Sequence, residues 1–600
     1  MGIKTYSSKW GNTVKYTALA LLFFSTSASA QYVSTEKTYD ERLRKANSVS
    51  ALNNDLFGDS INLKDGTVQF SQTDVSLPIN GNLRLDFTRH TPRQKQGLDR
   101  AAAPLGAGWE IDIPYMMGTY DTRTGWDARG SLARCSSPVL APSERVGPSP
   151  DYNTRVMSSE MYWSGIFINA PGVGYESLLK LVSGQPVPQD GANYIGAANG
   201  FWRVSCMPSI RNGTGEGFIV RTPNGNKYYF DWMATRNAAD VLVSEYYRDA
   251  NGDGTSPAMT LVPTMDVFLY ASKVEDRFGN YINYNFDPQN PSRLTSMVSS
   301  DGARIDVSYD GTGKVSEVRS GASVWRYTYI DTYYGKKLSD VALPDQSHWS
   351  FPVNNAVNYG VMSWYMVPPT LPASFYMNSC AQSANGFRSQ DPADSAYVNV
   401  ITMRHPSGAQ GEFTIRSLVH GSDNTPGGCG LFGSSSSDFW FGSYGIPNAY
   451  LARSIIAKKI SGPGIDELNW SYSYQPRWSF DNGCSSGCTS VTTVQQPDGS
   501  SIQYIFGNSY TQDFGDLLSE KISRDGLIIQ QTSYLKDDST STPYPATYGS
   551  LIAPKGNPLS TRLRPIKELR LQRDGTNYLR RVNSFDQMGR PSMETKSSIP

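Results

Sequence analysis

Histidine is the scarcest chemically versatile residue in this 600-residue chain. The four histidines are His90, His348, His405 and His420, and none belongs to an HExxH pair that could hold a catalytic zinc. The chain also has no Walker-type phosphate loop, the usual signature of a P-loop nucleotidase. Carboxylates are numerous, but no pair of them predicts a glycosidase site. We therefore expect a protein that is not an enzyme, and we keep a secreted glycoside-acting enzyme as the third hypothesis.

The chain also lacks a surplus of either charge and, beyond its N-terminus, any long apolar run. It has 54 basic and 54 acidic residues, and without residues 1–30 the balance is 51 minus 54, or −3. A near-neutral chain has no electrostatic footprint for nucleic acid or for an anionic membrane. About 20 apolar residues are needed to cross a bilayer. We therefore expect no nucleic-acid partner and no transmembrane segment in the mature chain.

The N-terminus has the pattern of a signal peptide. Lys4, Lys9 and Lys15 form a positive flank, residues 18–24 are a short apolar stretch, and small residues at 28–30 suit a signal peptidase. A membrane anchor is the alternative, but the apolar stretch is too short for one. The pattern predicts cleavage after residue 30 and export through the inner membrane, to the periplasm, the cell surface or the medium.

Aromatic and turn-forming residues are abundant. The chain has 36 Tyr, 23 Phe, 12 Trp, 54 Gly and 36 Pro, a composition that favours pleated strands joined by turns. Leu83, Leu85 and Phe87 alternate with polar residues, as in a half-buried strand. One short amphipathic helix is expected over residues 39–52. The sequence predicts a mainly β fold of many short antiparallel strands with at most a few short helices.

An internal repeat is most visible over residues 273–350. Alternating strands begin at Ile282, Ile305 and Trp325, which are 23 and 20 residues apart, and turn glycines lie near them. That spacing is the length of one two-stranded hairpin. A unit of this size cannot bury its own apolar face, so neighbouring units must stack to form a core.

Several motifs in and around this repeat resemble the Rhs/YD-repeat family. Residues 309–315, Tyr-Asp-Gly-Thr-Gly-Lys-Val, resemble the YD repeat, residues 585–591 are a looser match, and Asp276–Asn280 resemble another unit. In such a turn the aromatic ring packs inward, Asp caps the turn and Gly takes a positive φ. Further patches resemble the N-terminal region or the inter-repeat segments of exported bacterial members: 57–66, 71–78, 215–230, 405–409 and 497–500.

The resemblance implies an extended, curved β-sheet shell of the polymorphic-toxin type. Such shells enclose or present a C-terminal toxin or another polypeptide. The family's self-cleaving DPxGL-like signature is missing, because Asp287-Pro288 and Asp391-Pro392 are not followed by the required glycine. We therefore expect the N-terminal portion of such a protein, without the C-terminal core and toxin. The expected function is an exported scaffold for a C-terminal or partner polypeptide, and the alternative is a surface adhesin that binds carbohydrate.

The same patches suggest six successive regions. They are a signal peptide at 1–30, an N-terminal β region with a short helix at 31–130, a β-rich region with loop insertions at 131–265, a YD-like segment at 266–352, a β-rich inter-repeat region at 353–480, and a second, incomplete YD-like segment at 481–600.

An even number of cysteines follows the predicted cleavage point, which suggests disulfide bonds in an exported chain. They are Cys135, Cys206, Cys380, Cys429, Cys484 and Cys488. Fifteen connectivities exist, and we expect nearest neighbours to pair: 135 with 206, 380 with 429, and 484 with 488. A metal site at Cys484-x-x-x-Cys488 is the competing interpretation, although no second close Cys or His pair accompanies it.

One loop has the spacing of a calcium site. Asp249, Asn251 and Asp253 occupy positions 1, 3 and 5 of an EF-hand-like loop, and glycine follows at position 6. The twelfth position is Thr260 instead of Glu, so a substitute such as Asp266 would have to fold back. Asn, Asp and Gly also form ordinary exposed turns. Calcium is the one cofactor that the sequence suggests.

Overall fold

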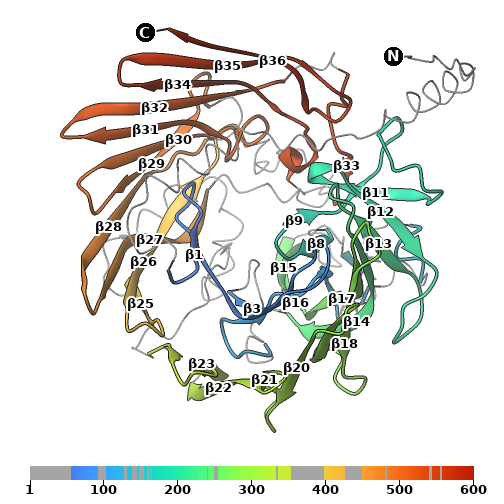
Figure 1. Ribbon diagram of the computed structural model, residues 1–600. Helices are drawn as coiled ribbons and strands as arrows, with labels where there is room; N and C mark the ends of the chain where they lie inside the picture. The colour runs from blue at the N-terminus through green and yellow to red at the C-terminus, as the bar shows by residue number, and fades with distance from the viewer. Residues whose placement is uncertain are drawn as a thin grey trace, which may run out of the picture. The chain divides into compact units, whose positions relative to one another are not determined.

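The structure is a computed structural model (Figure 1). It describes residues 56–91, 103–123, 125–126, 132–137, 145–147, 155–157, 163, 165–238, 241–248, 255–332, 335–352, 398–425, 449–479, 483–538, 543–553 and 557–599. All of its strands lie in the second of two compact units, Phe57–Pro600. The predicted signal peptide and the helix expected over 39–52 lie outside the described residues.

The fold is almost entirely β, as predicted. Among the described residues there is no α-helix, and the helical elements are two 3-10 turns, Asn199–Phe201 and Pro558–Thr561. None of the helices in this part of the chain is long and apolar enough to cross a membrane. The six predicted regions remain a prediction.

A small antiparallel sheet follows the start of the second unit. Its strands lie in the order β1 (Asp59–Ile61), β2 (Val68–Leu77), β3 (Leu85–His90) and β4 (Glu110–Ile111). The alternation predicted at residues 83–87 is confirmed, because Leu85 and Phe87 are buried while Asp86 between them is not.

A second sheet contains 28 strands. Strands pair antiparallel with their neighbours from β10 to β14, from β17 to β32 and from β34 to β36. Up to β24 they are β10 (Leu179–Lys180), β11 (Tyr194–Ala198), β12 (Trp202–Met207), β13 (Gly217–Arg221), β14 (Lys227–Asn237), β17 (Thr264–Glu275), β18 (Tyr281–Phe286), β19 (Leu294–Ser299), β20 (Arg304–Tyr309), β21 (Val315–Ser320), β22 (Ser323–Thr332), β23 (Gly335–Ala342) and β24 (His348–Ser350).

The sheet continues into the C-terminal third of the chain. These strands are β25 (Val398–Arg404), β26 (Gln410–Gly421), β27 (Ala449–Gly462), β28 (Ile465–Gln475), β29 (Thr489–Gln495), β30 (Ser501–Gly507), β31 (Leu517–Arg524), β32 (Leu527–Lys536), β33 (Ser550–Leu551), β34 (Ile566–Arg573), β35 (Thr576–Phe585) and β36 (Pro591–Ile599). A side branch leaves β17 through β5 (Tyr115–Asp121), β8 (Phe167–Ala170) and β9 (Gly174–Ser177). Two hairpins stand apart, β6 (Arg145–Gly147) with β7 (Arg155–Met157) and β15 (Val241–Arg248) with β16 (Thr255–Val262).

The repeat predicted over 273–350 forms hairpins of this sheet. The expected strands are β18, β20 and β22, with β19 and β21 between them. The YD-like turns have the predicted cap. Asp310 Oδ1 accepts hydrogen bonds from the amides of Thr312 (2.8 Å) and Lys314 (2.9 Å), and Gly313 has a φ of 81°. Asp276 and Asp586 cap their turns in the same way.

The small sheet packs on one face of the large one through aromatic rings. Phe413 on β26 lies edge-on to Phe57 and Phe70, with ring centroids 5.9 and 4.8 Å apart. Phe87 similarly contacts Tyr327 on β22. Burying these rings supplies much of the stabilisation that neither sheet could obtain alone.

A buried ion pair lies in the same interface. The guanidinium of Arg89 on β3 pairs with Asp74 on β2 at 3.0 Å, and both side chains are only 1% exposed. The guanidinium also lies over the rings of Trp109, Trp349 and Phe351, at 4.8–5.2 Å from their centroids. Contacts with the aromatic faces and with the carboxylate together offset the free energy lost when the guanidinium charge is removed from water.

The loop before β34 connects distant strands. Its short strand β33 pairs with β10, with Leu551 opposite Leu179. Tyr544, Tyr548 and Leu563 from the same part of the chain pack in one apolar cluster with Leu179 and with residues of β11 and β35. Strands far apart in the chain are therefore joined.

Candidate functional site

The predicted calcium loop lies outside the described residues. Asp249, Asn251 and Asp253 fall between the paired strands β15 and β16, and Thr260 is part of β16. Asp266 is on β17, where its carboxylate accepts a 2.6 Å hydrogen bond from Thr119, and burial raises its pKa to about 6. The calcium site remains a prediction.

Two of the three expected disulfides are present. Cys135 is bonded to Cys206 and Cys484 to Cys488, with Cα atoms 5.4 and 5.9 Å apart. Both bonds match the nearest-neighbour pairing. Cys380 and Cys429 lie outside the described residues.

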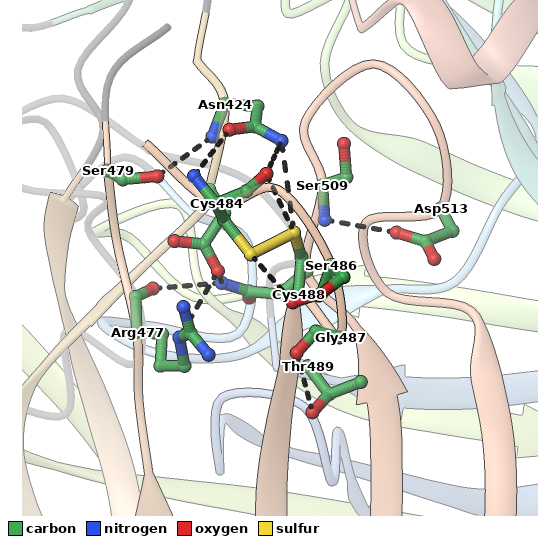
Figure 2. Close-up of a disulfide and its surroundings, with 12 residues drawn as sticks. Asn424, Arg477, Ser479, Cys484, Ser486, Gly487, Cys488, Thr489, Ser509 and Asp513 are labelled. Atoms are coloured by element: carbon green, nitrogen blue, oxygen red, sulfur yellow. Dashed lines mark hydrogen bonds and ion pairs between the residues drawn. A yellow bond between two sulfur atoms is a disulfide. The ribbon is translucent and has the colours of Figure 1, made fainter. Parts of the chain in front are cut away.

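The Cys484–Cys488 bond lies within a group of polar side chains that we call the disulfide cluster (Figure 2). Its members are Asp423, Asn424, Arg477, Cys484, Cys488 and Asn508. The Asn424 side chain clamps the cysteine loop, because its Oδ1 accepts from the amide of Cys484 (3.1 Å) and its Nδ2 donates to the carbonyl of Cys484 (2.9 Å). Asn508 Nδ2 donates to Asp423 Oδ2 at 2.9 Å, so the cluster also includes the loop after β30.

A docked turn, residues 62–67 between β1 and β2, adjoins the disulfide cluster. The Lys64 ammonium bonds Ser490 and Asn508, and burial lowers its pKa to about 8. The carbonyl of Leu63 accepts from Thr492, and the carbonyl of Gly66 accepts from the amide of Ile455 at 2.8 Å. A turn from the start of the unit is thus held on β27–β30, largely through its backbone.

Gly66 shows how closely the docked turn approaches the sheet. It has a φ of 74°, and a Cβ atom built there would lie 2.4 Å from the Tyr474 hydroxyl. A larger residue would strain the backbone and push the turn away from β28.

His420 lies beneath the docked turn and forms a pair with Ser454. Its Nε2 is 2.8 Å from Ser454 Oγ, and that hydroxyl donates its one proton to the carbonyl of Asp65 at 2.6 Å. The hydroxyl must therefore accept from His420, so this imidazole cannot be the general base for Ser454. Burial, with a smaller effect of Lys64, lowers the His420 pKa to about 3. The arrangement is structural and not that of a nucleophile and its base.

The cysteine loop also spells a GxSxG sequence, residues 483–487. In hydrolases that motif forms a sharp turn from a strand into a helix. Here the next element is strand β29, and both serines lie inside the loop that the Cys484–Cys488 disulfide closes. The geometry is not that of a nucleophile elbow.

A row of paired residues shows that the face beneath the docked turn continues far beyond it. Residues directly opposite each other on paired strands point to the same face. Successive pairings link Tyr474, Thr492, Tyr504, Glu520, Thr532, Leu571, Tyr578 and Ser598, from β28 to β36. Thr492 contacts the docked turn and is buried, whereas Tyr578 at the far end is 46% exposed.

Exposed apolar side chains gather on the strands at that end. Eight of the twelve large apolar side chains that are exposed among the described residues lie between 527 and 599: Leu527, Ile528, Ile529, Leu535, Ile566, Tyr578, Met593 and Ile599.

Strand β36 pairs with β35 along one edge. The other edge of β36 is not paired with any strand among the described residues. Strand β5 is not its partner, because both edges of β5 are already paired, one with β17 and one with β8. We call the part of the row from Leu571 to Ser598, with the strands that carry it, the uncovered face (Figure 1, upper left).

The described residues give less support to the two alternative functions. An adhesin for sugars calls for a cluster of exposed aromatic rings, but only Phe278 and Tyr578 are exposed in this part of the chain. A cavity of about 350 Å³ on β26–β29 includes Glu412, Lys458 and Trp470 in its lining, and Glu412 is the one carboxylate among its lining residues. Paired carboxylates, which glycoside hydrolysis requires, are not brought together there.

Comparisons with known proteins find similar solved structures but no matching protein family. No protein-family model and no curated protein matches the chain. Similar solved structures include crystal structures of TcdB2-TccC3-TEV, TcdB2-TccC3 and TcdB2-TccC3-Cdc42, with identities of 9%, 8% and 9% and TM-scores of 0.29, 0.25 and 0.22. The matches cover 92%, 90% and 90% of this chain but 44%, 37% and 29% of those chains, so this chain spans less than half of their length.

Proposed function

We propose that this chain is an exported, non-catalytic β-scaffold whose uncovered face holds an extended partner polypeptide. The observation that supports this most directly is the row from Tyr474 to Ser598. Its first part is covered by the docked turn, whereas in its last part Tyr578 is 46% exposed and Leu571, paired with it, is only half-buried. An exposed aromatic ring beside a half-buried leucine is apolar surface of the kind found at binding sites.

The docked turn indicates what kind of partner fits. On β27–β30 the occupant is a turn of the same chain, held by its carbonyls and by a lysine. The strands of the uncovered face continue the same pleated surface. An extended polypeptide with alternating apolar side chains would match the side-chain spacing of that surface.

The open edge of β36 supports the same proposal. A long unpaired edge offers a row of amide and carbonyl groups to any further strand. A scaffold that holds a polypeptide beside this edge would cover both the edge and the apolar face next to it. We propose that the partner is either the continuation of the same polypeptide or a separate chain presented at the cell surface.

A protease-protection experiment tests this function. An unstructured, protease-sensitive reporter polypeptide is fused after Pro600, and its cleavage is compared with that of the free reporter. The fused reporter should be cleaved at least about tenfold more slowly, because the uncovered face would hold it. A tenfold effect corresponds to about 1.4 kcal/mol of binding free energy. The double variant Leu571→Asp, Tyr578→Asp should lose the protection.

The matched control for this experiment is Leu535→Asp. Leu535 is 55% exposed on β32 but points to the opposite face from Thr532. This variant should protect the reporter as the wild type does. Equal cleavage of the fused and the free reporter would overturn the proposed function.

A further inference from the structure

Cys484 and Cys488 have the spacing of half a structural zinc site, and the fold supplies a third donor. Pairs of cysteines two to four residues apart are common zinc ligands. A carboxylate oxygen of Asp423 and the two sulfurs all lie within 4.8 Å of one another. Asp423 follows β26, and it was not in the predicted metal site because nothing in the sequence links it to the cysteines.

The polar contacts of Asp423 point independently to a missing ligand. The residue is only 1% exposed. Its Oδ2 accepts from Asn508 and lies 3.5 Å from Arg477 Nε, whereas its Oδ1 has no hydrogen-bond partner among the described residues. A buried carboxylate oxygen without a partner is unfavourable, so a ligand that binds it would be stabilised.

We propose that reduction of the Cys484–Cys488 disulfide opens a binding site for Zn²⁺ or a similar thiolate-preferring divalent cation, with Cys484, Cys488 and Asp423 as ligands. Tetrahedral coordination would be completed by one water molecule. The bonded sulfurs of the oxidised form offer no thiolate, so the site is controlled by redox state.

The reduction balances with a dithiol as the reductant. The dithiol transfers two electrons and two protons, the sulfur–sulfur bond breaks, both cysteines become thiols, and the dithiol closes to its own disulfide. Cys488 is the more accessible sulfur, because Cys484 is 6% exposed and Cys488 is only half-buried. Attack on the Cys488 sulfur releases the Cys484 sulfur as the leaving group.

Metal binding then displaces the two thiol protons. Two metal–sulfur bonds and one metal–oxygen bond form, and three anionic ligands around a divalent cation leave one negative charge. The guanidinium of Arg477 lies next to Asp423 and offsets that charge.

The site remains in place when the disulfide opens. Asn424 holds the backbone of Cys484 through both its amide and its carbonyl (Figure 2). Asn424 also directly follows Asp423 in the chain. The amide of Asn424 also donates to the Ser479 hydroxyl at 3.2 Å. This clamp involves neither sulfur–sulfur bonding nor the carboxylate, so the three donors stay close to one another.

Cobalt titration of the purified full chain tests the site. Co²⁺ replaces Zn²⁺ as the probe, because cobalt thiolates absorb light. The chain reduced with a phosphine should bind one more equivalent of Co²⁺ than the oxidised chain, with a thiolate-to-cobalt absorption band. The reduced double variant Cys484→Ser, Cys488→Ser should lack that equivalent, although its other four cysteines are unchanged. Equal binding by the oxidised and reduced wild type, or by the reduced wild type and the double variant, would overturn the proposal.

Asp423→Asn tests the carboxylate separately. This near-isosteric change should weaken Co²⁺ binding by about tenfold or more while leaving the absorption band, since both thiolates remain. Asp513→Asn is the matched control, because Asp513 accepts from the amide of Ser509 in the same region but is not one of the three donors. Wild-type affinity in Asp423→Asn would exclude Asp423 as a ligand. The comparison of oxidised and reduced wild type needs no variant, and equal binding in that comparison overturns the proposal even where a variant fails to fold.

Discussion

Strands β22–β30 and strands β31–β36 share one sheet and the same antiparallel pairing, but they differ in what lies on them. On the first group lie the small sheet and the docked turn, and Phe413 there is fully buried. On the second group Val582 and Phe585 are buried against the loop before β34, whereas Tyr578 and Met593 are about half exposed. Strand pairing alone therefore does not bury a residue of this chain. The core forms only where another segment covers one face of the sheet.

The covered group also contains buried ionisable groups, which the cover removes from water. His420 and Lys64 lie at the docked turn, and their pKa values are lowered by burial. The uncovered group carries charge mainly in half-exposed pairs such as Arg580 with Glu594. Surface pairs of that kind contribute little to stability. We expect the two groups to respond very differently to pH and to truncation.

Acidification should give the largest difference. The His420 pKa is lowered from 6.5 to about 3, so the stability that its neutral form provides is present above pH 6.5 and is lost as the pH falls towards 3. The loss amounts to about 5 kcal/mol at full protonation. His420→Gln should remove this part of the acid sensitivity, as measured by urea unfolding at pH 7 and pH 4.

The control for this measurement is His348→Gln, because the side chain of His348 is 52% exposed and its contact with Asp340 is a surface pair, which contributes about 1 kcal/mol or less. It should change the difference in unfolding free energy between pH 7 and pH 4 far less than His420→Gln does. If His420→Gln shows the same pH dependence as the wild type, His420 is not a buried neutral imidazole.

Truncation of an aromatic ring should separate the two groups almost as strongly. Phe413→Ala removes a ring that contacts Phe57 and Phe70, and it should cost about 3–5 kcal/mol of unfolding free energy. Tyr578→Ala on the uncovered face should cost about 0.5 kcal/mol or less, as for other exposed positions. Denaturant unfolding of both variants measures the contrast. Similar losses would mean that Tyr578 is covered in solution.

The sequence predicted the local features of this contrast but not the contrast itself. Alternation at 83–87 and in β18, β20 and β22 follows from period-two patterning, and the Asp-capped turn at Asp310 follows from the Tyr-Asp-Gly motif. These features depend on residues within about ten positions of one another, so a single sequence contains their signal.

The candidate sites depend on contacts between residues far apart in the chain. Lys64 and Asn508 are 444 residues apart, and Asn424 and Cys484 are 60 apart. Whether two such residues meet depends on the register of every strand pair that lies between them in the chain. The disulfide at Cys484 could be predicted from cysteine spacing, whereas Asp423 had no signal at all among the many carboxylates.

The charged network between the two sheets should give an effect of intermediate size. Arg236 on β14 bonds Glu110 on β4 at 2.7 Å and Tyr270 at 3.0 Å, and the carboxylate of Asp266 lies in the same network. Burial raises the Asp266 pKa from 3.8 to about 6, so the stabilisation present below pH 3.8 is lost as the pH rises through 6.

Asp266→Asn should therefore stabilise the protein at pH 7.5 and not at pH 4. The gain is up to about 3 kcal/mol, because the amide needs no charge and can still accept the hydrogen bond from Thr119. Denaturant unfolding at the two pH values measures it. Destabilisation at pH 7.5 would show that the attraction between Asp266 and Arg236 outweighs the burial of the charge.

The smallest expected effect comes from the two Asp-capped turns. Comparing them separates the contribution of a turn to the unfolding free energy from that of the segment that covers it. Asp310 and Asp586 each accept two amide hydrogen bonds of 2.8–2.9 Å, so either change to Ala should cost about 1 kcal/mol. The turn at Asp310 is tied to the covering segment, since Lys314 Nζ donates to the carbonyl of Ala103 at 2.8 Å. At the turn of Asp586 no such hydrogen bond to another segment is seen among the described residues, and the contact there is the packing of Phe585 against Tyr544 of the loop before β34.

The two variants should therefore lose the same local stability, but different measurements should detect the loss. Asp310→Ala should lower the global free energy of unfolding, because its hairpin opens only together with the cover. Asp586→Ala should leave the global value nearly unchanged and instead speed amide hydrogen exchange in β35 and β36, which can open without the rest of the sheet. Hydrogen-exchange mass spectrometry with denaturant unfolding distinguishes the two. If Asp586→Ala lowers global stability as much as Asp310→Ala, then β36 is held as firmly as the covered strands, and a partner on the uncovered face is not needed to order it.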